Sequence, residues 1–167
     1  MKHISLLLMG IILMSGCGRM TRVPEDKRAI RKVFEVNLPR KEIYSRALEW
    51  CAKRFSDVKE DIVVRDAEKG TIIARGVGKY SEYFDLLVDR EFSYSMTVET
   101  KDTRYRVTFD NFTVYYDERQ MKSGKAEYRF ELDKIAKKLE RDMNGLHEYI
   151  SRGATGEKDK QKSGEDW

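Results

Sequence analysis

The sequence is poor in the residues that build reactive or cross-linked sites. Among its 167 residues are two cysteines, two histidines and two prolines, and 29 acidic residues nearly balance 33 basic ones. So few thiol and imidazole groups give no zinc-ligand spacing, and the carboxylates are scattered among basic neighbours, so no acid–base pair stands out. A net charge of +4 provides no strong field of one sign to select a partner. We therefore expect no metal, no cofactor and no catalytic residue.

Long hydrophobic runs are also scarce, and the one at the N-terminus is short. Lys2 and His3 precede an apolar run at residues 4–14, which has the length of the hydrophobic part of a signal peptide and is too short to span a bilayer as a helix. The run leads into "LMSGC" at residues 13–17, which resembles the bacterial lipobox, with Met14 where a lipobox prefers leucine. The sequence thus predicts a signal peptide over residues 1–16 and lipidation of Cys17.

Acylation of Cys17 would decide where the protein resides. Each buried CH₂ of an acyl chain such as palmitate contributes about 0.8 kcal/mol, so several chains make a permanent anchor. Gly18 follows the cysteine, which favours the outer membrane, facing the periplasm, over the inner membrane. The alternative is that residues 4–14 form a buried helix or an uncleaved anchor and that Cys17 is an ordinary thiol.

The rest of the chain divides into two polar ends and one domain-sized segment. Residues 17–30 are charged and contain Pro24 without an apolar period, which is typical of a tether. Residues 151–167 are rich in Gly, Lys, Glu and Asp and indicate a flexible tail. Residues 31–150 are clearly periodic and are predicted to form one domain.

Periodicity within residues 31–150 predicts an α+β fold. A strand at residues 31–36 is followed by a helix that begins at Pro39, a hairpin at residues 61–76 turns at Gly70, and two strands alternate over residues 92–99 and 104–109. The apolar parity then slips, which predicts a β-bulge near Asp110 and Asn111. A long helix ends near Ile150. The order β-α-β-β-β-β-α indicates an antiparallel sheet with two helices on one face.

Two stretches, "VFEVNLPRKEIYSRALEW" and "DAEKGTIIARG", carry a family resemblance. They resemble a bacterial family of small envelope proteins described as a domain of unknown function with a TBP-like fold, and the resemblance covers residues 31–116. It implies the fold and no activity. Nucleic-acid binding is not expected, because the strand residues on the predicted open face offer no aromatic stacking platform. Those open-face residues are Ser93, Ser95, Thr97, Glu99, Arg104, Arg106 and Thr108.

Reactive residue types inside the domain have structural interpretations. Cys51 lies on the apolar face of the first predicted helix, where a free cysteine packs as a small hydrophobe. His147 lies near a helix end, where a cation complements the helix dipole. Gly76 and Gly78 lack the spacing of a phosphate loop, and we expect them to permit a bulge or a close approach at a strand.

Residues 80–88 form the most apolar segment without a clear period. The segment either continues a strand or forms an apolar loop, and in the second case it is a possible partner surface. The residues of this surface are Tyr83, Phe84, Leu86 and Leu87.

Taken together, the sequence predicts a membrane-anchored envelope lipoprotein whose domain is a non-enzymatic binding or structural module. The expected partners are the membrane, through the lipid on Cys17, and another envelope protein. An alternative is a carrier or sensor of a small apolar or amphiphilic ligand held between the helices and the sheet.

Overall fold

A computed structural model describes residues 21–55, 61–83, 87–117 and 121–153. Its elements are a short 3₁₀ helix η2 (Glu25–Lys27), the strands β1 (Ile30–Glu35), β2 (Asp61–Asp66), β3 (Thr71–Tyr83), β4 (Leu87–Lys101), β5 (Arg104–Tyr115) and β6 (Ser123–Lys125), and the helices α2 (Arg40–Arg54) and α3 (Arg129–Arg152). The order matches the predicted one, with the short β6 added before α3.

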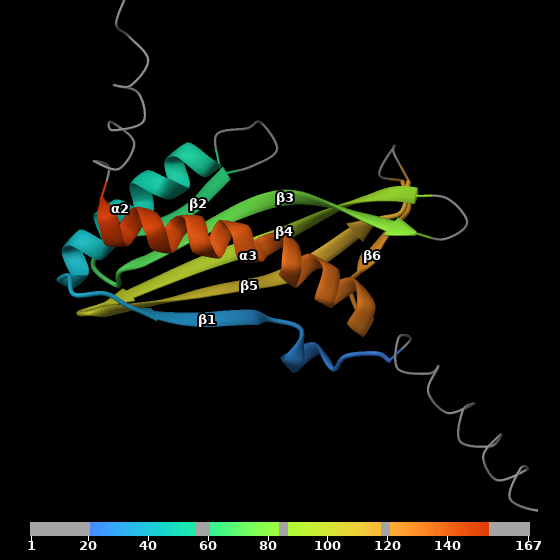
Figure 1. The fold of residues 1–167 in the computed structure, drawn as a ribbon, viewed down its shortest axis with the longest axis horizontal. Helices are drawn as coiled ribbons and strands as arrows, with labels where there is room; N and C mark the ends of the chain where they lie inside the picture. The colour runs from blue at the N-terminus through green and yellow to red at the C-terminus, as the bar shows by residue number, and fades with distance from the viewer. Residues whose placement is uncertain (1–20, 56–60, 84–86, 118–120, 154–167) are drawn as a thin grey trace, which may run out of the picture.

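The strands form one antiparallel sheet of order β1-β5-β4-β3-β2. β1 pairs with residues 104–109 of β5 and β6 with residues 113–115, so the two short strands follow one another along the same edge of β5. Both helices lie across one face of the sheet (Figure 1). The predicted two-layer α+β architecture is confirmed.

The helices begin where the sequence places them. Pro39 is the N-cap of α2, and the backbone N–H of Arg40 donates to Asp102 Oδ1 at 2.8 Å, which ties this helix to the β4–β5 turn. At the start of α3 the Glu131 carboxylate accepts from the backbone N–H of Tyr128 at 3.3 Å. Such contacts satisfy donors that a helix leaves unpaired at its N-terminus.

The core lies between the sheet and the helices. Alternate residues of β4 and β5 are buried there, as the period-two pattern predicts, and the helices contribute residues at steps of three and four. Apolar burial of this kind stabilises a fold by about 25 cal/mol per Å². The fully buried side chains include Ile43, Phe92, Met96, Val98, Val107, Phe109, Ile135, Leu139, Leu146 and Ile150.

A β-bulge interrupts β5 where the sequence predicts it. Ser93 pairs with Thr113 and Ser95 with Asp110, so β5 contains one more residue than β4 between these pairs. Asn111 adopts a φ of 54°, a left-handed conformation that asparagine tolerates better than most residues. The extra residue returns Phe112 to the buried face of the sheet.

Close packing explains the two glycines of β3. A Cβ at Gly76 would overlap the Tyr94 ring, and a Cβ at Gly78 would overlap the Phe92 ring. The expected close approach at these positions is confirmed, and the rings of β4 occupy the space that side chains on β3 would need.

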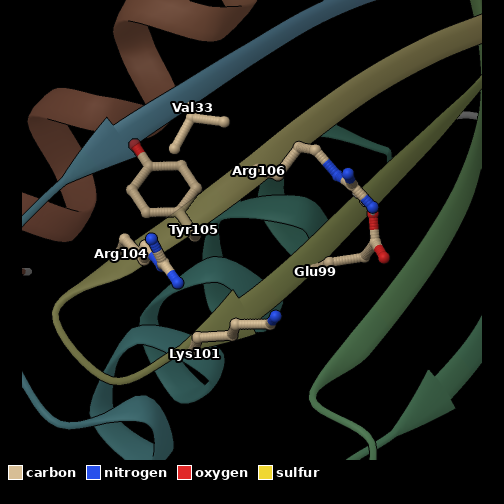
Figure 2. A pocket seen from close by; sticks show the side chains of 6 residues that line it. All are labelled: Val33, Glu99, Lys101, Arg104, Tyr105 and Arg106. Atoms are coloured by element: carbon tan, nitrogen blue, oxygen red, sulfur yellow. Dashed lines mark hydrogen bonds and ion pairs between the residues drawn. The ribbon is translucent and has the colours of Figure 1, made fainter.

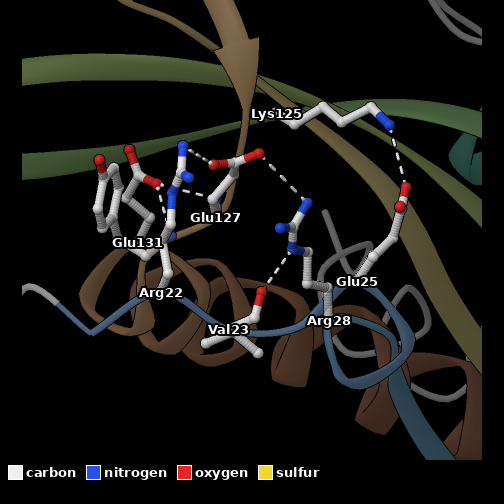
Figure 3. A network of polar contacts seen from close by, with 8 residues as sticks. Arg22, Val23, Glu25, Arg28, Lys125, Glu127 and Glu131 are labelled. Carbon is white, nitrogen blue, oxygen red and sulfur yellow. Dashed lines mark hydrogen bonds and ion pairs between the residues drawn. The ribbon is translucent and has the colours of Figure 1, made fainter.

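The folded unit begins earlier than the predicted boundary at Arg31. Val23 is 2% exposed, its N–H donates to Glu127 O at 2.7 Å, and the N–H of Arg129 donates to Thr21 O at 3.0 Å. Arg22 and Arg28 both pair with the Glu127 carboxylate (Figure 3). Residues 21–30, expected to belong to a tether, therefore pack on the domain, because Val23 has an apolar site to fill and its backbone finds partners.

Residues 80–83 and 87–88 continue β3 and β4, so the strand interpretation of this segment applies to them. Tyr80 pairs with Arg90, and Tyr83 with Leu87. Among the described residues no helix is long and apolar enough to cross a membrane. Residues 1–20, with Cys17, lie outside the described residues.

Candidate functional site

The face of the sheet opposite the helices is not covered by either helix and is lined by polar side chains (Figure 1). The polar residues predicted there alternate along β4 and β5 with buried apolar residues, which places them on this face. Three of these residues on β4 are half-buried: Ser93, Ser95 and Thr97. Because these side chains border one another across strands, the surface is an ordered array of hydroxyl and charged groups.

A hollow of about 530 Å³ opens on this face beside the bulge. Ser93 Oγ lies 3.4 Å from Tyr115 Oη, and Asn111 Nδ2 donates to Ser95 Oγ at 3.4 Å. Arg75 and the half-buried Glu91 add charge at its rim. These groups can donate and accept hydrogen bonds toward an occupant. Sequence reasoning found the bulge but missed the hollow, because a hollow depends on how three strands curve together.

A second hollow, of about 430 Å³, separates the bulge from the N-terminal segment. Asp110 and Arg31 line it, together with Arg28 and Lys125. Burial raises the pKa of the Asp110 carboxyl, and the charge of Arg31 opposes that rise. Asp110 Oδ1 also accepts from Asn111 Nδ2 at 2.9 Å, so the carboxylate and the bulge hold each other in place.

A third, smaller hollow of about 200 Å³ lies at the β4–β5 turn (Figure 2). Lys101 and Arg104 face each other across the turn, and Arg106 Nη2 lies 2.6 Å from Glu99 Oε2. Val33 is 58% exposed at its edge. Exposed ion pairs of this kind contribute little to stability. The sequence patterning does predict that Glu99, Arg104 and Arg106 share this face.

Cys51 and His147 have structural partners instead of reactive ones. Cys51 is a buried free thiol, and desolvation raises its pKa to about 12, so it stays protonated at neutral pH. The ring of His147 stacks on Phe34, with 4.7 Å between centroids, and its Nδ1 lies 3.1 Å from Tyr105 Oη. Within the described parts of the chain, no group of three His, Cys, Asp or Glu could hold a metal ion.

A polar cluster that sequence reasoning missed joins α3 to the sheet near the β3–β4 hairpin. Glu131, 3% exposed, accepts from Tyr116 Oη at 3.0 Å, and Glu82, 8% exposed, accepts from Lys134 Nζ at 3.3 Å. The Arg90 guanidinium lies 3.7 Å from Glu82. A signal was present for Glu131, which stands at the third helical position where a glutamate reaches back to the N-cap backbone. Glu82 gives no such signal.

The predicted partner surface at residues 83–87 is described in part. Tyr83 is 77% exposed at the end of β3. Leu87 begins β4, and its side chain lies outside the description. Phe84 and Leu86 lie outside the described residues.

Residues 31–115 match the family described as "Domain of unknown function (DUF4468) with TBP-like fold". The chain belongs to this family. The match begins at β1 and ends with β5, so it covers the helix α2 and the five main strands and stops before α3. No protein with curated annotation matches the chain.

Two solved structures share the fold of this DUF4468 chain. A DUF4468 family protein from Bacteroides ovatus is 19% identical, with a TM-score of 0.61 over 81% of this chain and 94% of that chain. A TBP-like protein from Parabacteroides distasonis is 14% identical, with a TM-score of 0.63 over 77% of this chain and 97% of that chain. At such identities the likeness establishes the TBP-like fold of the DUF4468 domain. Its function has to be inferred from the residues of the site, because one fold can host many functions.

Proposed function

We propose that the protein is a lipid-anchored, non-enzymatic binding module of the bacterial cell envelope, and that its open sheet face binds another envelope protein. The observation that carries this proposal is the hollow of about 530 Å³ on that face, which hydroxyl, amide and charged side chains line. Both helices pack on the other face, so a partner can approach without displacing an element of the fold.

The chemistry of the open face suits a protein partner. Tyr115 and Arg75, of types enriched at protein interfaces, lie on the hollow with the hydroxyls of Ser93 and Ser95. Ordered hydroxyl and amide groups supply hydrogen bonds, which specific interfaces contain at about one per 100–200 Å². A partner that presents backbone amides or complementary polar side chains would pair with them.

The proposed anchor is the lipidated Cys17, with the outer membrane, facing the periplasm, as the proposed location. Cys17 precedes Thr21, the first described residue, by four positions. Four extended residues reach at most about 14 Å, so an acylated Cys17 would hold the domain close to the bilayer surface. The signal-peptide pattern and "LMSGC" support this part of the proposal.

The non-enzymatic part of the proposal is supported by the state of the reactive side chains. Cys51 faces the core as a protonated thiol, and His147 is held between Phe34 and Tyr105. A nucleophile and base would need to face a shared, accessible site.

A carrier of a small apolar ligand between the helices and the sheet has less support. The side chains of Ile43, Ala47, Ile72, Ile135 and Leu146 pack into that space and are 0% exposed. A ligand there would have to separate α2 and α3 from the sheet, at the cost of the burial that stabilises the domain.

Photo-crosslinking in cells tests the binding face. Benzoylphenylalanine would replace Ser95, inside the hollow, and in a matched variant Lys137, which is exposed on α3. We expect a crosslinked protein adduct from position 95 and none from position 137. Adducts from position 137 alone, or from neither position, would remove the open face as the binding surface.

Intact mass of the protein from detergent-solubilised membranes tests the anchor, beside a Cys17→Ser variant. The proposal expects a chain that starts at Cys17 and carries acyl groups, and loss of that species in the variant. A chain that still begins at Met1 without acyl groups would contradict it.

A further inference from the structure

The first argument concerns the end of the domain at which the N-terminal segment enters. The pairing of Thr21 with Arg129 and of Val23 with Glu127 fixes this segment beside the start of α3. If Cys17 is acylated, as proposed above, its lipid lies within about 14 Å of Thr21. This end of the domain is then held next to the bilayer.

The second argument concerns what that end exposes. Met121 is 78% and Tyr83 is 77% exposed, and the other exposed large apolar side chains that the structure describes are between 39% and 58% exposed. Figure 1 shows that β3 ends, and β6 lies, toward the end of the molecule where the N-terminal segment enters. Tyr83 is the last residue of β3, and Met121 comes two positions before β6. The two most exposed apolar side chains therefore lie at the end that the anchor holds near the membrane.

Hydrogen bonds link β4, β5 and Lys122 to the start of α3, beside which the N-terminal segment lies. Arg90, opposite Tyr80 in the β3–β4 hairpin, donates through Nη1 to Tyr116 O. Tyr116 N in turn donates to Lys122 O at 2.7 Å, next to Met121. Tyr116 Oη reaches Glu131 in the first turn of α3. Hydrogen bonds thus join the described ends of β3, β4 and β5, Lys122 and the start of α3 into one platform.

Charge at this end indicates how the platform meets lipid. Two basic side chains near this end are paired with acidic ones, Arg22 with Glu127 at 2.7 Å and Lys125 with Glu25 at 3.0 Å, while Lys122, beside Met121, is exposed. Paired charges give little attraction to anionic lipid headgroups. A tyrosine ring fits the boundary between headgroups and acyl chains, and an exposed methionine adds apolar surface that a bilayer can bury.

We infer that Tyr83 and Met121 form a membrane-contacting surface and that this platform rests on the bilayer to which Cys17 is anchored. This inference rests on the proposed lipidation of Cys17. A bilayer contact at this end turns the β4–β5 turn away from the membrane and leaves the open sheet face accessible from the periplasmic side. The contact should persist at high salt, since it is made by apolar groups.

Fluorescence quenching in vesicles tests the inference with the full mature lipoprotein. The protein would be purified from membranes and reconstituted in phosphatidylcholine vesicles, with a polarity-sensitive fluorophore on an introduced cysteine in Tyr83→Cys or Met121→Cys. Lys101→Cys, exposed at the β4–β5 turn, is the matched control. Cys51 is buried and protonated and Cys17 would be acylated, so the introduced thiol is the one labelled.

We expect lipid-borne quenchers to reduce fluorescence at positions 83 and 121 several-fold more than at position 101, in low and high salt alike. Equal quenching by aqueous iodide at all three positions, in protein whose mass shows acylation, would overturn the inference and leave the anchor intact. A mass without acyl groups would instead contradict the proposed function, and the inference with it.

Discussion

The two faces of the sheet are built from the same strands and differ sharply in chemistry. Along β4, Phe92 is fully buried against the helices, while its neighbour Ser93 is half-buried on the open face. The helix side holds rings, branched chains and a protonated thiol, and the open side holds hydroxyls, an amide and ion pairs. Stability therefore resides on one face, so residues on the other can serve binding without a large effect on folding.

Truncation of two neighbouring residues on β4 should give the largest difference in the free energy of unfolding between the two faces. Phe92→Ala should reduce the free energy of unfolding by about 3–5 kcal/mol, because it removes a fully buried ring. Ser93→Ala should change it by about 0.5 kcal/mol or less, as is usual away from the core. Urea denaturation of both variants measures the difference. Equal losses would mean that the open face is part of the core.

Adding a methyl group on the helix side of the sheet tests the contrast by overpacking the core instead of truncating it. Gly78→Ala should destabilise the domain by about 1–3 kcal/mol, because the new Cβ would overlap the Phe92 ring. In a double-mutant cycle with Phe92→Leu the cost of Gly78→Ala should shrink, since the ring is gone. Additive losses in that cycle would indicate that the methyl group meets something other than Phe92.

Alkaline pH should weaken the helix side selectively. Burial raises the pKa of Cys51 from 9.0 to about 12, and burial with the nearby Glu131 raises that of Tyr116 from 10.0 to about 12. The unfolded chain loses these protons first, so the stabilisation is complete below pH 9 and is lost as pH rises toward 12, at about 1.4 kcal/mol per unit for the buried Cys51 and less for the partly exposed Tyr116, whose surroundings solvent screens. The urea midpoint of unfolding of the Cys17→Ser protein should decrease between pH 9 and 10. A further Cys51→Ala change should reduce this dependence of the midpoint on pH. If the dependence is unchanged, it arises from groups other than Cys51.

Two tyrosines of the helix side give the smallest expected effects. Tyr116→Phe should cost about 1–2 kcal/mol, because its hydroxyl donates to the buried Glu131 carboxylate. Tyr80→Phe should be neutral or slightly stabilising, because Tyr80 Oη is buried and has no hydrogen-bond partner among the described residues. Thermal unfolding of the two variants compares them. A larger loss for Tyr80→Phe would reveal a partner for its hydroxyl, such as an internal water.

The sequence was sufficient for local features that depend on neighbours along the chain. Pro39, the turn at Gly70 and the parity slip at Asp110 each reflect backbone preference or side-chain period, and all three predictions are confirmed. The open-face residues followed from the same alternation. Such signals are local, so one sequence contains them.

Features that depend on distant parts of the chain escaped prediction. Val23 is buried, and its backbone N–H pairs with Glu127, more than a hundred positions later, while its charged surroundings in sequence resemble a linker. Glu82 is buried because Lys134 and Arg90 converge on it from α3 and β4. The hollow on the open face depends on three strands and one bulge. The lipidation of Cys17 and the surface at Tyr83 and Leu87 stay predictions.

The pairing of the N-terminal segment also sets when the protein can fold. Ile30 pairs with Phe109, and Thr21 O accepts from the backbone N–H of Arg129. The strand β1 therefore has no partner until most of the domain has been synthesised. Contacts between such distant residues slow folding, because a long loop must close before they contribute. Residues 21–35 consequently remain without their strand partners until β5 and the start of α3 have been synthesised, so the sheet can close only when nearly the whole domain is present.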